Sequence, residues 1–119
     1  MNEMTISRFT AAELIKEYYE YHYFDLVNVK VKPKLEGNDL CMKVKIISVL
    51  NHKRLVENIT LNQGQITTLL NDYMEINYCK IHKITFEPYF HNINIKYSGE
   101  IENLKSMKPV TNMQRVYSS

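Results

Sequence analysis

The chain has 119 residues, 45% hydrophobic and 24% charged, with a formal net charge of +2 at pH 7. This fits one globular domain, and so small a net charge is no evidence for nucleic-acid or membrane binding. The longest mostly apolar run, residues 46–50, is too short to cross a bilayer, and the N-terminus lacks the pattern of a secretory signal. We therefore expect a cytoplasmic protein.

The first predicted element is a helix over residues 10–23. Thr10 and Glu13 have the spacing of a capping box, in which each side chain satisfies a free amide of the first turn. The side chains that recur at helical spacing after this start form one apolar stripe: Ala11, Leu14, Ile15, Tyr18 and His22.

Three strands are predicted next, over residues 26–34, 40–50 and 54–60, because apolar and polar side chains alternate there with a period of two. A turn at residues 36–39 separates the first two strands. The apolar side includes Val27, Val29 and Val31, and the opposite side is rich in lysine. The pattern indicates a sheet that is covered on one face and open on the other.

A second helix is expected from a capping box at Asn62 and Gln65 to an end near residues 76–77. Two further strands follow, over residues 80–87 and 90–97, and we expect His82 to lie half-buried on the same face as Ile84 and Phe86. Residues 103–119 are interpreted as a polar tail that docks on the body or on a partner.

The expected fold is a single α+β domain over residues 1–102, with the order helix, three strands, helix, two strands. A two-layer sandwich is predicted, with a mainly antiparallel sheet and both helices on one face. The double-stranded RNA-binding domain has the same initial order, but it places lysines at the start of its second helix. Residues 62–68 contain no Lys or Arg, so the likeness is one of element order only.

The first candidate site is the lysine face, which we define as Lys30, Lys32, Lys34, Lys43 and Lys45. Residues 27–60 carry seven positive and three negative side chains, a local charge of +4 that also includes Lys53 and Arg54 at the next turn. These seven residues are a candidate nucleic-acid-binding surface. The alternative interpretation is a solvated face whose lysines prevent edge-to-edge association.

The second candidate site is an aromatic cluster at the end of the first helix. A helix buries only part of its circumference, so two or three of Tyr19, Tyr21 and Tyr23 should be exposed or lie at an interface. Exposed tyrosine is a favoured interface anchor, because it buries a large area with few rotatable bonds. The predicted protein interface consists of Tyr18, Tyr19, Tyr21, Tyr23 and Phe24.

Catalysis and metal binding are not expected. Cys79 and His82 have C-x-x-H spacing, but structural zinc sites usually need a second close pair, and no phosphate-binding loop or hydrolase motif is present. The two cysteines, Cys41 and Cys79, are expected to be reduced thiols. No cofactor and no small-molecule substrate are predicted.

The sequence thus predicts a non-enzymatic interaction protein that binds a protein partner or itself through the Tyr-rich helix end. The alternative is a nucleic-acid-binding module that uses the lysine face. Residues with A/T-rich codons, such as Asn, Lys, Ile and Tyr, are abundant. This bias indicates a low-GC bacterium, and an inhibitor or adaptor of a phage or mobile element is an expected setting.

Overall fold

The computed structural model describes residues 2–22, 26–88 and 91–100 and contains two helices and six strands in these residues. The predicted order of helix, three strands, helix and two strands is confirmed, and a further short strand precedes it. The elements are β1 (Asn2–Ile6), α1 (Arg8–His22), β2 (Leu26–Glu36), β3 (Asp39–Leu50), β4 (Lys53–Leu61), α2 (Gln63–Ile76), β5 (Lys80–Phe86) and β6 (Ile93–Ser98). The predicted tail, residues 103–119, lies outside the described residues.

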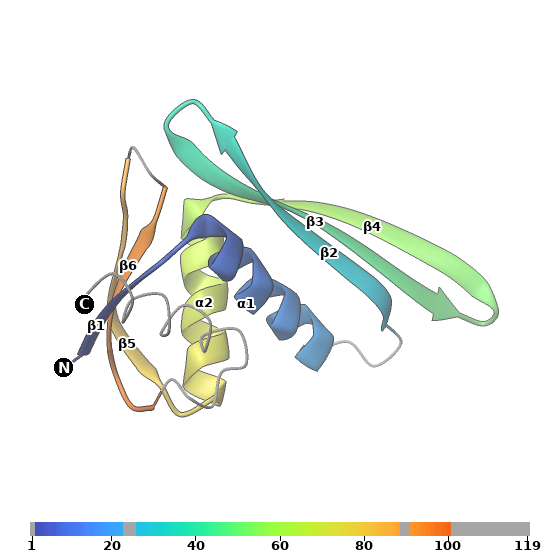
Figure 1. Ribbon diagram of the computed structural model, residues 1–119. Helices are drawn as coiled ribbons and strands as arrows, with labels where there is room; N and C mark the ends of the chain where they lie inside the picture. The colour runs from blue at the N-terminus through green and yellow to red at the C-terminus, as the bar shows by residue number, and fades with distance from the viewer. Residues whose placement is uncertain (1, 23–25, 89–90, 101–119) are drawn as a thin grey trace.

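The strands form two separate antiparallel sheets, in the orders β1-β6-β5 and β2-β3-β4 (Figure 1). The mixed α+β class is therefore confirmed, but a two-layer sandwich with both helices on one face of one sheet is not. Two sheets arise because α2 carries the chain away from β4, after which β6 pairs with β5 on one side and with β1 on the other. Strand β1 was not predicted from the sequence, because it is only five residues long and has only two buried side chains, Met4 and Ile6.

The hydrophobic core lies where the helices meet the sheets. Helix α1 packs against β2 and α2, whereas α2 packs against strands of both sheets. The stripe of α2 buries Ile66, Leu70 and Met74, as the helical spacing of apolar residues requires. The largest fully buried side chains come from both helices and from β1, β3 and β6: Ile6, Leu14, Ile15, Leu40, Met42, Ile46, Ile66, Leu70, Met74, Ile93 and Ile95.

The helix caps explain where the two helices begin. Ser7 caps α1, because its Oγ accepts a 3.1 Å hydrogen bond from the amide of Thr10, so the predicted cap at Thr10 is wrong by one turn. The capping box at Asn62 and Gln65 is confirmed by two reciprocal hydrogen bonds of 2.9 Å. After α2, the residue in the left-handed region is Tyr78, with φ 65°.

The sheet β2-β3-β4 is built from two hairpins with two-residue turns. Both central residues of the second turn, Asn51 and His52, have positive φ, which is typical of a type I′ turn that matches the twist of the strands. A bulge between Leu26 and Asn28 interrupts the alternation, so Val27 is 59% exposed and not on the covered face. The end of the β3–β4 hairpin extends beyond the helices (Figure 1).

No helix in the described part of the chain has the length and apolar character needed to cross a membrane.

Candidate functional site

The register of the sheet β2-β3-β4 places four lysines as two facing pairs. Lys30 is the cross-strand partner of Lys45, and Lys32 is the partner of Lys43. All four side chains are exposed. Side chains in such positions leave the same face of the sheet, with Cβ atoms about 4.5–5.5 Å apart. We call these four residues the lysine quartet.

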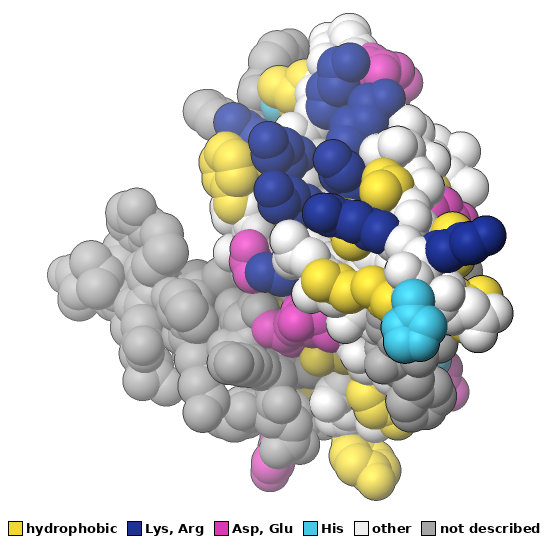
Figure 2. Space-filling view, turned by 90° about the vertical axis from the view of Figure 1, so that its right-hand side faces the viewer, with side chains coloured by type: hydrophobic (Ala, Val, Ile, Leu, Met, Phe, Trp, Pro, Cys, Tyr) yellow, Lys and Arg dark blue, Asp and Glu magenta, His cyan; other side chains and the backbone are white. Residues whose placement is uncertain are grey.

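Most of the lysine and arginine side chains on the face seen in Figure 2 gather over its upper part, where this sheet lies. The quartet therefore forms one positively charged surface and is not scattered over the molecule. The predicted alternation that opposed lysines to the buried side chains Val29 and Val44 is confirmed, since both valines are 2% exposed.

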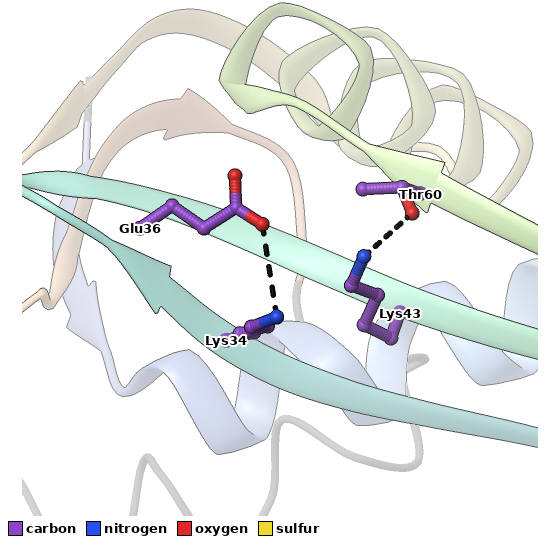
Figure 3. A network of polar contacts seen from close by, with 4 residues as sticks. All are labelled: Lys34, Glu36, Lys43 and Thr60. Atoms are coloured by element: carbon purple, nitrogen blue, oxygen red, sulfur yellow. Dashed lines mark hydrogen bonds and ion pairs between the residues drawn. The ribbon is translucent and has the colours of Figure 1, made fainter.

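Few carboxylates balance this charge. The Nζ of Lys34 lies 3.8 Å from Oε1 of Glu36, next to the first turn (Figure 3). The Nζ of Lys43 donates a 2.9 Å hydrogen bond to Oγ1 of Thr60, which holds the ammonium group over β4 (Figure 3). Within the described ranges, no ion pair is found for any member of the quartet. Its four positive charges are therefore left to solvent or to a ligand.

A facing pair of lysines in the other sheet differs from the quartet, because a carboxylate lies beside it. Lys83 and Lys96 are cross-strand partners in the other sheet, but Lys96 also faces Glu3 of β1. The carboxylate of Glu3 therefore occupies the neighbouring cross-strand position beside that lysine pair. Among the described strand residues on the outer face of β2-β3-β4, acidic side chains appear only beside the first turn, at Glu36 and Asp39. The positive charge of the quartet is therefore less balanced by carboxylates than that of the Lys83–Lys96 pair.

The quartet lines a shallow hollow of about 350 Å³ together with polar side chains of β4. Asn58 faces Lys45 and Thr60 faces Lys43, so an amide and a hydroxyl lie beside the ammonium groups. The side chains that the register places on this face of the described strands include no aromatic ring. The surface can hold an anion, but it offers no platform on which a nucleobase could stack.

The remaining basic residues of the predicted nucleic-acid surface do not join the quartet. Lys34 is on the same face but beside Glu36. Lys53 faces Leu50 and therefore lies on the opposite side of the sheet from the quartet. Arg54 is on the quartet's side, but it faces Val49 near the far end of the hairpin.

Sequence reasoning missed the contribution of Asn58 and Thr60 to this surface. The signal was available in principle, because Arg54, Val56, Asn58 and Thr60 alternate along the third predicted strand. However, alternation alone does not say which of its two sides lies beside the lysines. That depends on the register with β3.

The predicted aromatic interface is only partly at the surface. Tyr19 is 6% exposed and belongs to the core, so it is not available to a partner. Tyr18 is half-buried, and its ring meets the ring of Tyr73 edge-on with centroids 6.4 Å apart. Tyr21 is 61% exposed. Tyr23 and Phe24 lie outside the described residues.

The cysteines are free and buried, in keeping with the expected reduced thiols. Burial raises the pKa of the Cys41 thiol, and nearby Glu36 and Asp39 add to the effect, so the reactive thiolate is disfavoured. The Sγ of Cys79 donates a 2.9 Å hydrogen bond to the backbone carbonyl of Glu100. No group of three or more metal-ligating side chains is found among the described residues.

His82 is not the half-buried core residue that alternation predicts. A bulge between Ile81 and Lys83 shifts the register, so His82 is exposed while Ile84 remains half-buried. The ring Nε2 of His82 lies 3.0 Å from Oγ of Ser98 on the neighbouring strand.

No protein-family model matches the chain, and no curated protein or solved structure is significantly similar to it.

Proposed function

We propose that the protein is a non-enzymatic binding module whose lysine quartet binds the phosphates of a nucleic acid. The observation that carries this proposal is the two facing Lys–Lys pairs in the register of β2 and β3, near which no balancing carboxylate is found among the described residues. Like charges in facing positions destabilise a sheet, and an anion between them removes that cost.

The spacing of the quartet fits a ligand with repeated charges better than a single small anion. The two pairs lie two residues apart along the strands, about 6.6–6.8 Å. Within each pair, the side chains leave strands that are about 4.7–4.9 Å apart. Four ammonium groups over such an area can contact several phosphates of one backbone, and each contact releases a condensed counterion.

The lack of an aromatic ring among the described side chains of this face supports recognition of the backbone and not of the bases. Proteins that bind unpaired bases commonly stack them on aromatic side chains. Lysine, Asn58 and Thr60 instead offer donors for phosphate oxygens. We therefore expect binding with little sequence preference and a strong dependence on salt.

The test is a titration of the protein into a fluorescently labelled DNA duplex at several salt concentrations. Four phosphate contacts predict a slope of log K against log salt concentration of about −3 to −4. The variant K30Q/K32Q/K43Q/K45Q should lose binding and salt dependence together. The matched control K83Q/K96Q removes a facing lysine pair from the other sheet and should bind with nearly unchanged affinity.

Two outcomes would overturn the proposal. The first is no binding of wild-type protein to duplex or single-stranded nucleic acid even at low salt. The second is a loss of affinity per removed lysine that is as large in the control as in the quartet variant, because net charge alone would then explain the binding.

A second candidate function, binding of a protein partner at the end of α1, is favoured by the 61% exposure of Tyr21. The ring of Tyr21 stands edge-on to His22, with centroids 5.1 Å apart, and so forms a small aromatic surface. An adaptor of a phage or mobile element would use this end to hold a host protein. In a pull-down from the native host, Tyr21→Ala should lose the partner, whereas Tyr78→Ala, which alters an 86% exposed ring after α2, should retain it.

A further inference from the structure

The outer edge of β4 is an open pairing surface. Strand β4 is the last strand of its sheet, and its residues 53–58 are all exposed. It contains no proline, and its pairing with β3 runs from Leu61 to Lys53 without a bulge. Leu55 is 46% exposed and Val56 is 51% exposed. A long, regular and partly apolar edge is a template for a further strand.

The opposite edge of the same sheet is protected, which shows that the open edge is a specific property of β4. Strand β2 contains Pro33, which lacks a backbone donor, and a bulge between Leu26 and Asn28. It also carries three lysines. These are the features by which proteins prevent edge-to-edge association, and β4 has neither the proline nor the bulge.

The hairpin turn determines which backbone groups of β4 point outward. Leu50 and Lys53 flank a two-residue turn, so they form a hydrogen-bonded pair with each other. Alternation then directs the peptide groups of Lys53, Leu55 and Glu57 toward β3. The peptide groups of Arg54 and Val56 point to the free edge, where a second strand can bind them.

We propose that two copies of this chain pair through their β4 edges in antiparallel fashion, around a two-fold axis at Leu55. In this register, Leu55 faces Leu55 of the second copy, and Arg54 exchanges backbone hydrogen bonds with Val56 of the second copy. Lys53 faces Glu57 of the second copy, and the symmetry repeats this ion pair. The edge is thus complementary to itself in charge, in apolar side chains and in backbone groups.

The charges select this register over its neighbours. Residues that face each other across an antiparallel pair lie on the same side of the sheet. The two-fold axis must therefore pass between two copies of the same residue, and each alternative register moves the axis by one residue along the strand. An axis at Glu57 would oppose two carboxylates, and an axis at Lys53 would oppose two ammonium groups. An axis at Val56 forms no ion pair. An axis at Leu55 overlaps only residues 53–57 of each copy, so the two bodies lie at opposite ends of the joined sheet.

The pairing makes one six-stranded sheet and covers residues 53–57 of each β4 edge. A two-fold axis perpendicular to a sheet keeps each face on its own side, so both lysine quartets lie on the same surface. This inference goes beyond the proposed function, and its test requires no nucleic acid.

The test is sedimentation of the purified full chain over a range of concentrations up to about 1 mM, where an association worth only about 4 kcal/mol is detected. Wild type should form dimers. Lys53→Glu and Glu57→Lys should each weaken the dimer by on the order of tenfold, because two ion pairs become two repulsions. The double variant K53E/E57K should restore dimerisation, since the pairs are rebuilt with reversed signs.

A cross-link gives an independent measurement of the register. Under mild oxidation, Leu55→Cys should form an intermolecular disulfide, because a facing pair at the axis brings two Cβ atoms close together. Asn58→Cys, which lies on the same exposed strand but away from the axis, should remain monomeric on a non-reducing gel. A monomeric wild type at the highest concentration, or a double variant that stays monomeric, overturns the proposal.

Discussion

The phenol of Tyr73 in α2 donates a 2.8 Å hydrogen bond to carboxylate oxygen Oε2 of Glu17 in α1, across 56 residues of sequence. Burial, followed by this hydrogen bond and the charge of Glu17, raises the pKa of Tyr73 above its ordinary value. The ring of Tyr18 stands edge-on beside that of Tyr73. This contact joins the two helices at the base of the predicted aromatic cluster.

Removing the hydroxyl should weaken the contact between the helices. Tyr73→Phe keeps the ring but removes the hydroxyl group that donates to Glu17, and we expect a loss of about 1 kcal/mol of unfolding free energy, since the site is only partly buried. Urea unfolding measures the change. Tyr78→Phe removes a hydroxyl from an 86% exposed ring and should leave stability unchanged. Equal stability of Tyr73→Phe and wild type would show that the hydrogen bond contributes nothing.

Stability should fall at alkaline pH in a way that depends on Tyr73. Its pKa in the folded protein is raised above the ordinary value of 10.0, so the unfolded chain loses the phenolic proton first. The stability that this group contributes is complete below about pH 10 and is lost as the pH rises above it. Urea unfolding at several pH values should show a smaller alkaline loss in Tyr73→Phe than in wild type. Parallel curves for the two proteins would contradict this.

A charge reversal in the lysine quartet should change stability and binding in opposite directions. Lys32→Glu converts the repulsion with Lys43 into an attraction, and we expect about 0.5–1 kcal/mol of added stability. The same change should weaken nucleic-acid binding and reduce the magnitude of its salt slope. Thermal unfolding and a salt titration measure the two effects. A variant that is both less stable and equally able to bind would argue against a functional quartet.

Gly99 should tolerate no side chain. Its φ of 109° lies where L-residues are strained, and an added Cβ would collide with the backbone carbonyl of Tyr78. We expect Gly99→Ala to cost at least about 2 kcal/mol. Gly37 also has positive φ, but no atom lies within 4 Å of an added Cβ, so Gly37→Ala should cost only about 1 kcal/mol. Urea unfolding of the two variants should show this difference, and equal losses would refute the collision.

Local rules account for much of the fold. The alternation over residues 26–60 predicts the strands β2, β3 and β4 and places Val29 and Val44 inside, because a period of two permits only two faces. The capping box at Asn62 predicts the start of α2, since its two hydrogen bonds join residues only three positions apart. The gathering of lysines on one face follows from the same alternation and was therefore visible in the sequence.

The pairing and packing of segments that are far apart along the chain could be read only from the tertiary structure. Apart from the short strand β1 and the two bulged positions, the sequence by itself determined which described segments form helices and strands and which side of each strand is apolar, since these properties depend on neighbours within a few positions. Only the tertiary structure decided that the strands divide into two sheets, that Tyr19 is buried, and that Lys53 lies opposite the quartet. Such features depend on register and packing between residues that are far apart along the chain, and a single bulge at Val27 or His82 reverses a face.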